Sequence, residues 1–226
     1  MSLDKLNQVV VYGLGAMGRP MARNLHKQNL LLGVKNRTRG KAQAMEKELN
    51  LTSFENDAVL FGTADCVLTC VSADNDLKAI ISNLIPHMKP GSVVIDCSTV
   101  SPQTAQSISD DLAANGIGFL DAPVSGGVEG AKKGSLSIMV GGDRQTYKRA
   151  ADIFSAIGSQ ITHMGKVGQG QATKAVNQVM VAGVAQAVCS SLAMAEQCKL
   201  DVKKVVEVLS AGAAGNWFLE NRGQTM

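Results

Sequence analysis

The feature that most constrains the fold is a glycine-rich turn near the start of the chain, in the segment VVVYGLGAMGRPMARNL (residues 9–25). An apolar run typical of a β-strand leads into Gly13-x-Gly15-x-x-Gly18, and a helical pattern follows at once. In such a motif the first glycine permits a tight turn, the second lets a pyrophosphate approach the backbone, and the third lets helix and strand pack closely. The helix start then offers free N–H groups to the phosphates. We therefore expect a dinucleotide-binding turn, and the alternative is a glycine turn that binds no ligand. The cofactor-binding residues predicted in this turn are Gly13, Leu14, Gly15, Ala16, Met17 and Gly18.

Short apolar runs alternate with amphipathic segments from residue 8 to about residue 165. Seven runs read as strands: VVVYG, LLLGVKN, DCVLTCV, SVVIDC, GIGFLDAP, SLSIMVGG and SQITHM. Helix-like stretches separate several of them, and one has a clear start, with Ser101 as N-cap and Pro102 at the first helical position. Continuous apolar strands alternating with helices indicate a parallel sheet covered on both faces. The expected fold class is therefore α/β, with a Rossmann-like, doubly wound, mostly parallel sheet.

The pattern changes after residue 170, where no further strand is expected. A long helix to about Lys199 is followed by a shorter one from Asp201 to Ser210, with Asp201 as its N-cap. We expect residues 1–167 to form an NADP-binding Rossmann domain and residues 168–226 to be the start of an all-helical domain for substrate binding and dimerisation. The expected helices leave more apolar surface than they can bury together, which predicts an incomplete domain and a homo-oligomer.

The stretch from residue 175 to residue 195 carries no charge and is long enough to raise the question of a membrane span. Polar residues interrupt it, and alanine is commoner in it than leucine or isoleucine. A helix buried between protein surfaces is the better interpretation, and we expect a soluble protein without a membrane partner.

Composition narrows the function classes. The formal net charge is +3 without a dense Lys/Arg block, which disfavours nucleic acid as a partner. The five cysteines and three histidines are scattered, so we expect reduced thiols and no metal site. The first residues, MSLDKLNQ, contain no apolar segment typical of a signal peptide, and the predicted location is cytoplasmic.

The end of the second predicted strand bears on the choice of cofactor. It reads Asn36-Arg37-Thr38-Arg39, and no Asp or Glu occurs between Arg19 and Met45. An acid at this place binds the ribose 2′-OH of NAD and would repel the 2′-phosphate of NADP. Arg37 can instead hold that phosphate, and Thr38 can donate a hydrogen bond to it. We expect NADP(H) to be preferred, with NAD(H) possible, and Asn36, Arg37 and Thr38 to contact the cofactor; the alternative is that the arginines are solvated loop charges.

Two later strand ends should line the same crevice, because ligands of open α/β sheets bind outside the carboxyl ends of the strands. The segments CVSADND (70–76) and DCSTVSP (96–102) both follow predicted strands and begin helices. Val71, Ser72 and Thr99 are therefore candidates for contact with the nicotinamide half of the cofactor. Ser98 and Thr99 can equally be plain capping residues.

The segment LDAPVSGGVEGAKKGSLSIMVGG (120–142) contains more special residues than an ordinary strand connection needs. Pro123 restricts the chain, and Ser125-Gly126-Gly127 exposes successive N–H groups beside a hydroxyl. Such a turn can bind an anion, for example a substrate carboxylate. A glycine-rich turn required only for packing is the alternative.

The segment GQGQATKAVNQ (168–178) places Lys174, Asn177 and Gln178 at positions i, i+3 and i+4, on one face of the expected helix. An ammonium held near a carbonyl oxygen can polarise it and supply a proton. Partial burial near a helix start should lower the pKa of such a lysine. We expect Gly168 and Gly170 to let the chain pass close to the cofactor. The alternative for Lys174 is a lysine that covers the helix end and keeps its ammonium in water.

The motifs at 13–25, 121–142 and 168–178, in this order and at this separation, resemble the β-hydroxyacid dehydrogenase family. The resemblance implies that Lys174 is the catalytic acid/base, that Ser125 and Gly126 hold the substrate carboxylate, and that Asn177 orients the substrate. Many members carry Asn-Asn where this chain has Asn177-Gln178. The Asn-Gln pair of this chain is similar to that of members that reduce tartronate semialdehyde. The resemblance also implies a longer helical domain, so we expect this chain to lack part of it.

The expected function is that of an NADP(H)-dependent oxidoreductase that interconverts a small 3-hydroxy acid and its semialdehyde or oxo acid. Lys174 is the expected general acid/base, and the substrate is a small carboxylate. An imine reductase of similar fold is disfavoured, because such enzymes commonly replace the lysine. A truncated or non-catalytic NADP-binding module of the same fold is the remaining alternative. The predicted substrate-binding residues are Ser125, Gly126, Gly127, Asn177 and Gln178.

Overall fold

The computed structural model describes residues 5–54 and 56–223. The chain divides into two compact units, Met1–Lys174 and Ala175–Met226.

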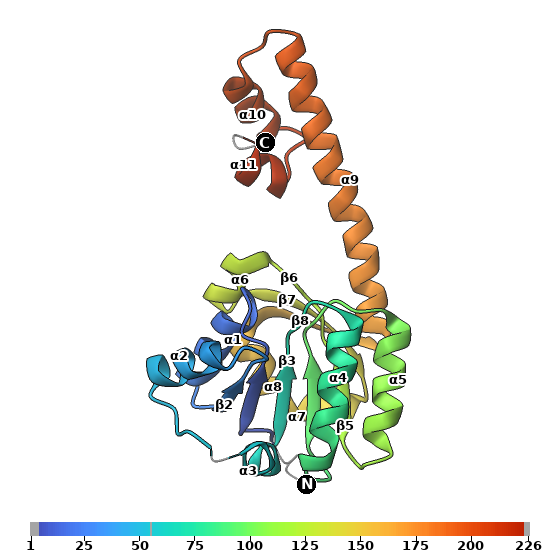
Figure 1. Ribbon diagram of the computed structural model, residues 1–226. Helices are drawn as coiled ribbons and strands as arrows, with labels where there is room; N and C mark the ends of the chain where they lie inside the picture. The colour runs from blue at the N-terminus through green and yellow to red at the C-terminus, as the bar shows by residue number, and fades with distance from the viewer. Residues whose placement is uncertain (1–4, 55, 224–226) are drawn as a thin grey trace. The chain divides into compact units, whose positions relative to one another are not determined.

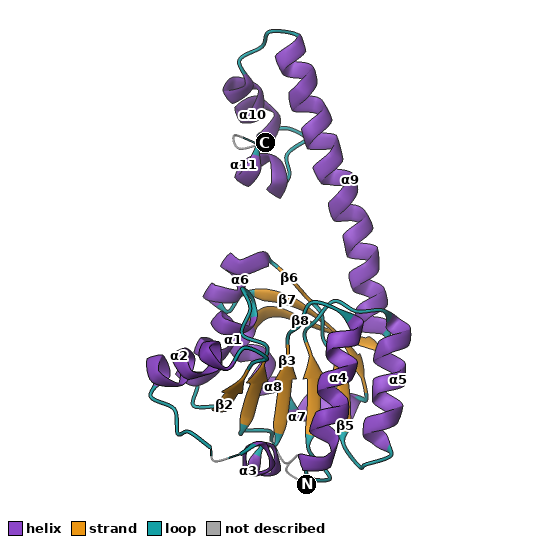
Figure 2. Cartoon of the chain, in the orientation of Figure 1, coloured by secondary structure: helices purple, strands orange, loops and turns teal. Residues whose placement is uncertain are grey.

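The first unit is built on a single twisted sheet (Figures 1 and 2). Five strands run parallel in the order β2-β1-β3-β4-β5. Next to β5 lies β7, which pairs antiparallel with β5 and β6 and parallel with β8. This confirms the predicted doubly wound, mostly parallel sheet. The strands are β1 (Val9–Tyr12), β2 (Leu31–Lys35), β3 (Cys66–Thr69), β4 (Val93–Asp96), β5 (Gly118–Asp121), β6 (Val124–Ser125), β7 (Leu136–Gly142) and β8 (Gly158–Gly165).

The central strands are apolar on both faces because both faces are covered. In β1, Val9 and Val11 belong to one buried cluster, whereas Val10 between them belongs to another. The same alternation occurs in β3, where Leu68 and Val67 point into different clusters. Side chains alternate between the two faces of a strand, so a continuous apolar run supplies two cores at once.

Two sets of helices supply the rest of these cores. Buried residues of α1 (Gly18–Lys27), α2 (Arg39–Leu49), α6 (Gly127–Lys133) and α8 (Ala151–Ile157) join the cluster on one face of the sheet. Buried residues of α3 (Asp57–Thr63), α4 (Asp74–Leu84) and α5 (Pro102–Ala113) join the cluster on the other. The two remaining short elements of this unit are η1 (Ile85–His87) and α7 (Arg144–Arg149).

The predicted start of α5 is confirmed. The Ser101 Oγ atom accepts a hydrogen bond from the Thr104 N–H at 3.1 Å, and Pro102 is the first helical residue. Two short helices, α3 and α6, were not expected. One of the helix-like stretches, RQTYKRAADIFSAI (144–157), is divided into α7 and α8 at Ala150.

The order of the strands creates a crevice next to β1. The chain passes from β1 to β2 on one side and then returns to β3 on the other side of β1. At such a switch point the connections after the two inner strands turn in opposite directions, which opens a space outside their carboxyl ends.

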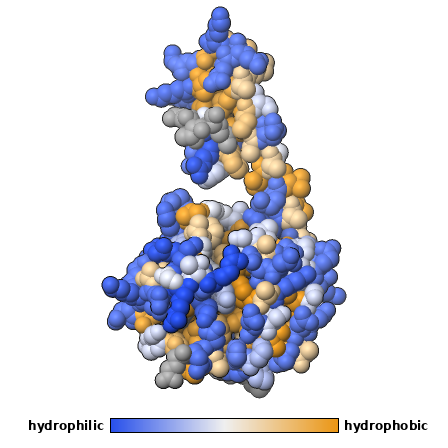
Figure 3. All heavy atoms as spheres, in the orientation of Figure 1, coloured by the Kyte–Doolittle hydropathy of each residue, from blue (hydrophilic) through white to orange (hydrophobic). Residues whose placement is uncertain are grey.

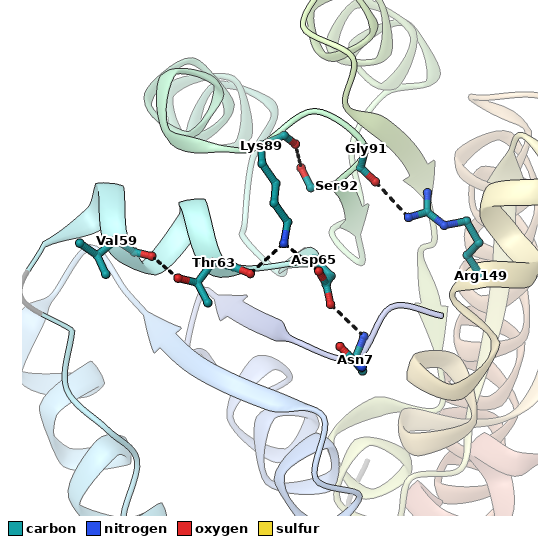
Figure 4. A network of polar contacts seen from close by, with 8 residues as sticks. All are labelled: Asn7, Val59, Thr63, Asp65, Lys89, Gly91, Ser92 and Arg149. Atoms are coloured by element: carbon teal, nitrogen blue, oxygen red, sulfur yellow. Dashed lines mark hydrogen bonds and ion pairs between the residues drawn. The ribbon is translucent and has the colours of Figure 1, made fainter. Parts of the chain in front are cut away.

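The amino ends of the strands, at the opposite edge of the sheet, are tied by a polar network (Figure 4). Asp65 accepts hydrogen bonds from the Lys89 Nζ atom at 2.9 Å and from the Asn7 N–H at 3.4 Å. The Arg149 Nη2 atom donates to the Gly91 carbonyl at 3.0 Å. These contacts join the segments that precede β1, β3 and β4, so they stabilise this edge of the sheet and lie away from the crevice.

The second unit consists of helices. The long helix α9 (Gln169–Gln197) begins within the first unit and is followed by α10 (Val202–Ser210) and α11 (Trp217–Arg222). The Asp201 Oδ1 atom accepts from the N–H groups of Lys203 and Lys204 at 3.0 and 3.3 Å, which confirms Asp201 as the N-cap of α10. A small core holds the unit together: Val188, Leu192, Val206 and Leu219.

Within the part of the chain that the structure describes, much of α9 is exposed, so these residues do not themselves provide the predicted burial between protein surfaces. The exposed side chains include Val176, Val179, Met180 and Met194, and apolar surface is visible in this region in Figure 3. The reason is that the small core of the second unit covers only one side of the later turns of α9. By length and composition alone α9 would suffice to cross a membrane, a criterion that core helices of soluble proteins also meet.

Candidate active site

The glycine turn between β1 and α1 has the geometry that its motif requires. Gly13 has φ +105°, and a Cβ atom there would lie 2.2 Å from the Cys70 carbonyl oxygen. A Cβ atom at Gly18 would lie 1.8 Å from the Gly13 carbonyl oxygen, whereas Gly15 has open space around this position. Gly13 and Gly18 are therefore required for the turn and its packing, and Gly15 leaves room for a ligand, so the turn fits a dinucleotide pyrophosphate.

Asn36 fixes the shape of this turn from the end of β2. Its Oδ1 atom accepts a hydrogen bond from the Leu14 N–H at 2.9 Å, and its Nδ2 atom donates to the Thr38 carbonyl at 3.1 Å. The Gly13 N–H donates to the Lys35 carbonyl at 2.9 Å. Asn36 was predicted as a cofactor contact. In the structure its side chain holds the turn through these hydrogen bonds.

A cleft of about 410 Å³ opens at the carboxyl ends of β1, β2 and β3. It brings together seven of the predicted cofactor residues: Gly13, Gly15, Asn36, Arg37, Thr38, Val71 and Ser72. The other predicted cofactor residues do not line it, and among these Leu14 is buried whereas Thr99 is exposed.

Sequence reasoning missed the residues that α4 contributes to this cleft. Asp76, Ile80 and Asn83 lie at positions i, i+4 and i+7 of one helical face, and Ala79 lies beside them. This spacing was a usable signal, because a helix that follows a strand at the switch point presents one face to the crevice. The cleft is also lined by Tyr12, Lys41 and Cys70.

The mouth of the cleft carries more positive than negative charge. Arg37 and Lys41 are both exposed there, and the Arg37 Nη1 atom forms an ion pair at 3.0 Å with the Asp76 Oδ1 atom. The Arg37 side chain is 85% exposed, so this ion pair is weak and can be exchanged for a bound anion.

A buried hydrogen-bond network supports the wall of the cleft. The Ser98 Oγ atom accepts from the Val71 N–H at 2.9 Å, and the Ser98 N–H donates to Asp96 at 3.2 Å. Asp96 also accepts from the Thr69 hydroxyl at 2.7 Å, while its Oδ2 atom is buried without a partner among the described residues. Burial raises the pKa of the Asp96 carboxyl to about 6. Burial also raises the pKa of the Cys70 thiol to about 12, so this thiol in the cleft is neutral.

The Ser125-Gly126-Gly127 segment forms a tight turn between β6 and α6. Gly126 and Gly127 have φ values of +124° and +61°, which glycine adopts readily and other residues rarely do. A Cβ atom at Gly127 would meet nothing within 4 Å. Both glycines are exposed and Ser125 is half-buried, so the turn is accessible to a ligand.

Lys174 lies in the second turn of α9 and is the last residue of the first unit. Its side chain is largely buried, with 8% of the residue exposed, and it forms no hydrogen bond or ion pair with the described residues. Desolvation by burial lowers the pKa of its ammonium. A buried amine without a fixed partner is suited to exchange a proton.

Asn177 and Gln178 follow on α9 within the second unit, and the Asn177 Nδ2 atom donates to the Gln178 Oε1 atom at 3.1 Å. Neither these amides nor Lys174 and Ser125 line the cleft at β1 to β3. Across residues 5–54 and 56–223, no group of three or more His, Cys, Asp or Glu side chains is placed to hold a metal ion.

Gly168 and Gly170 lie where the chain passes close to the sheet and to Asp121. A Cβ atom at Gly170 would lie 2.4 Å from the Met139 carbonyl oxygen and 2.6 Å from that of Asp121. The Gly168 N–H donates to the Asp121 carboxylate at 2.8 Å. Gly170 thus lets the start of α9 pack against β5 and β7, because a larger residue would collide with the sheet, whereas Gly168 has φ +88° and lies beside Pro102 and Gln106 of α5.

Two protein families match almost the whole chain. The family described as the NAD-binding domain of 6-phosphogluconate dehydrogenase matches residues 8–165. The one described as the NAD-binding of NADP-dependent 3-hydroxyisobutyrate dehydrogenase matches residues 168–226. A 2-hydroxy-3-oxopropionate reductase from Escherichia coli is 33% identical over 95% of this chain and 74% of its own length. The chain belongs to the β-hydroxyacid dehydrogenase family.

Other members of this family extend the comparison. An NAD-dependent L-serine dehydrogenase from Pseudomonas aeruginosa is 33% identical over 95% of this chain and 73% of its own length. The structure of 3-hydroxyisobutyrate dehydrogenase from Mycobacterium tuberculosis with L-serine matches with a TM-score of 0.85 and 28% identity. That match covers 96% of this chain and 74% of the other. The protein is therefore an NAD(P)-dependent hydroxyacid dehydrogenase of the β-hydroxyacid dehydrogenase family.

Proposed function

We propose that this protein interconverts a small 3-hydroxy acid and its semialdehyde or oxo acid, with Lys174 as general acid/base and NADP(H) as the preferred cofactor. The observation that carries the proposal is Lys174 itself. In a β-hydroxyacid dehydrogenase, a largely buried lysine without a polar partner in the described chain is an unusual residue to keep for stability alone.

The chemistry divides between cofactor and protein. A bound nicotinamide dinucleotide supplies the hydride in reduction and accepts it in oxidation. The Lys174 ammonium polarises the substrate carbonyl and donates a proton to its oxygen, and in the reverse direction the neutral amine takes the proton from the hydroxyl. Because burial lowers the pKa of Lys174, its charged and neutral forms are closer in free energy than those of an exposed lysine.

The Ser125-Gly126-Gly127 turn is the proposed carboxylate site, and Asn177 and Gln178 are the proposed contacts to the rest of the substrate. The accessible turn with two positive φ values supports this assignment. The substrates in the names of two relatives, L-serine and 2-hydroxy-3-oxopropionate, both carry a carboxylate and an oxygen on the third carbon. We propose a substrate of this chemical class for the present protein.

NADP(H) preference is proposed from the end of β2. Arg37, Thr38 and Lys41 line the cleft there, and no acidic residue occurs between Arg19 and Met45. Cations that form hydrogen bonds favour a 2′-phosphate, whereas NAD-binding sites usually have a carboxylate at this place. We propose Leu14, Ala16, Met17, Gly18 and Thr99 as further cofactor contacts that lie outside the lining of the cleft as it stands.

The test is turnover by the full-length protein with a panel of small 3-hydroxy acids, semialdehydes and 2-oxo acids, followed through the absorbance of the reduced cofactor. Lys174→Ala should lower turnover by roughly 10²-fold or more, the usual scale for a general acid/base. NADPH binding, measured by fluorescence titration, should be nearly unchanged. Lys166→Ala, at an exposed lysine just before α9, is the matched control and should keep wild-type turnover.

Two results would overturn parts of the proposal. Normal turnover in Lys174→Ala would remove the lysine mechanism. NADPH binding without turnover of any member of the panel, unchanged in Lys174→Ala, would instead indicate a non-catalytic dinucleotide-binding module. A cytoplasmic location and a homo-oligomer stay predictions and do not affect either result.

A further inference from the structure

The start of α9 is held by a carboxylate from another element. Asp121, the last residue of β5, is fully buried. Its Oδ1 atom accepts from the Gly168 N–H and its Oδ2 atom accepts from the Gln171 N–H, both at 2.8 Å. The first N–H groups of a helix have no partner within the helix, and a negative charge there is favoured by the helix dipole. Asp121 therefore caps α9 from 47 residues earlier in the chain.

Gln171 ties the same helix turn to the wall of the cofactor cleft. Its side chain is buried, its Nε2 atom donates to the Ser98 carbonyl at 2.8 Å, and its Oε1 atom accepts from the Val100 N–H at 3.2 Å. Ser98 in turn accepts from the N–H of Val71, which lines the cleft. A continuous series of hydrogen bonds thus runs from the cleft wall to α9.

The packing around these bonds leaves the helix start little freedom. Gly170 lies so close to the sheet that an added Cβ atom would come within 2.8 Å of the Asp121 Oδ2 atom, besides the two carbonyl oxygens already described. Hydrogen bonds and close packing together define where the first turn of α9 begins.

Lys174 depends on this first turn for its position. It follows Gln171 by three residues, about one helical turn, so both side chains project from neighbouring turns of α9. Because no hydrogen bond or ion pair from the described residues reaches its ammonium, the place of this buried side chain depends on the backbone of α9.

We propose that Asp121 and Gln171 are positioning residues that set where Lys174 lies relative to the wall of the cofactor cleft. The proposal rests on the proposed role of Lys174 as acid/base. It goes further, because it assigns a catalytic consequence to two buried residues that need not touch substrate or cofactor. Misplacement of a reacting group by about 1 Å can cost on the order of 10²-fold in rate, so such residues matter beyond stability.

Asp121→Asn is the principal variant, since it keeps the size of the side chain. One of its two acceptor oxygens becomes an NH₂ group that faces an N–H group, so the helix start has to move. We expect turnover per folded site to fall by about 10- to 100-fold. The dissociation constant for NADPH should stay within about twofold of wild type, because the glycine turn is untouched.

Asp143→Asn is the matched control. Asp143 also caps a helix, since its Oδ2 atom accepts from the Thr146 N–H at 2.8 Å, but that helix is the short α7. The substitution makes the same change from carboxylate to amide at a capping residue of the same unit without touching α9, and a single amide oxygen can still accept from Thr146. We expect a Tm close to that of wild type and wild-type turnover per folded site.

The position of Lys174 can also be tested without measuring turnover. Competitive labelling of lysine amines in the cofactor-free protein at a series of pH values, read by mass spectrometry, gives the titration of each amine. In Asp121→Asn the pKa of Lys174 should move back towards that of an exposed lysine, because a displaced ammonium is better solvated. The labelling of Lys166, an exposed lysine just before α9, is the internal reference and should be the same in all variants.

Gln171→Met provides an independent variant should Asp121→Asn fail to fold. It keeps the volume and removes both side-chain hydrogen bonds, and we expect the same fall in turnover and the same change in Lys174 labelling. If either folded variant lowers only the Tm, with wild-type turnover per folded site and wild-type Lys174 labelling, the positioning role is wrong. Failure of the lysine mechanism is recognised separately, by normal turnover in Lys174→Ala, and leaves the labelling result as a test of position.

Discussion

Arg37, at the mouth of the cleft, forms an ion pair within the protein. Its exposed guanidinium is paired with Asp76 of α4 at 3.0 Å. A 2′-phosphate offers a higher negative charge and two-point hydrogen bonding, so it should displace Asp76 from Arg37.

Arg37→Ala is therefore expected to raise the dissociation constant for NADPH by about 10- to 100-fold, the usual range for a hydrogen bond to a charged group. The dissociation constant for NADH should change little, because it lacks the 2′-phosphate. Arg39→Ala is the control, since Arg39 is exposed nearby and does not line the cleft. Equal loss of affinity for both cofactors would argue against a contact between Arg37 and the 2′-phosphate.

Asp96 gives a prediction for stability as a function of pH. Its pKa is raised from 3.8 to about 6, chiefly by burial, so the folded protein holds the proton more tightly than the unfolded chain. The stability that the protonated carboxyl contributes is fully present below about pH 4 and is lost as the pH rises through 6. Asp96→Asn keeps the acceptor for Thr69 and cannot ionise.

Relative to wild type, the free energy of unfolding of Asp96→Asn should thus increase by on the order of 2–3 kcal/mol between pH 4 and pH 7. Urea unfolding across this range measures it, with Asp110→Asn at an exposed carboxylate as the control. A difference from wild type that stays constant with pH would show that Asp96 does not titrate in this interval.

At the scale of elements, the sequence predicted the features whose formation depends on residues close together in the chain. The strands, the glycine turn and the caps at Ser101 and Asp201 all follow from local patterns and were found in the structure. The helices α3 and α6 were missed, because each spans only seven residues and is too short for a helical period to be recognised.

The candidate site was predictable where a residue's role follows from its local sequence. The glycine turn and the end of β2 were predicted, whereas the contacts of Asp121 and Gln171 were not, although both residues lie within the motifs at 121–142 and 168–178. The reason is physical: the hydrogen bonds of Gln171 span 71 and 73 residues, and nothing in the local sequence indicates which strand end will face this helix start. Such contacts follow from the fold and not from the spacing of a motif.

Substituting alanine for each of the two glycines of α9 distinguishes the effect of close packing on stability from the effect of helix propensity. Gly170 is pressed against the sheet, whereas Gly183 on the same helix has nothing within 4 Å of the position of a Cβ atom. Gly170→Ala should destabilise the protein by about 1–3 kcal/mol through overpacking, and Gly183→Ala should stabilise it by up to about 1 kcal/mol. Thermal unfolding compares the two; similar effects of both substitutions would mean that the start of α9 is not held against the sheet.

At the scale of the whole molecule, the two units differ in how well they bury their apolar residues. The first has a large buried cluster on each face of its sheet, whereas the core of the second has four buried residues among those that the structure describes. Val176, Val179 and Met180 lie at positions i, i+3 and i+4 of α9 and are each more than two-thirds exposed. An apolar stripe of this kind is typical of a surface that pairs with another protein surface.

If copies of the chain associate through this stripe, Val179→Lys and Met180→Lys should shift the protein towards monomer in sedimentation velocity experiments. A charged side chain buried in an apolar interface has a large desolvation cost, so the shift should be strong. Val59→Lys, at an exposed apolar residue of α3, is the control and should leave the association unchanged. An unaltered sedimentation profile in the α9 variants would place any association elsewhere.

The cap that Asp121 provides for α9 also has a consequence for recombining this protein with its relatives. A crossover between residues 121 and 168 would take the carboxylate from one parent and the Gly-Gln-Gly-Gln helix start from the other. A crossover after Gln171 keeps the carboxylate, its two N–H donors and the closely packed Gly170 from a single parent. Chimaeras built to change substrate specificity should therefore exchange the helices from a point within α9, and not at the boundary where the sheet ends.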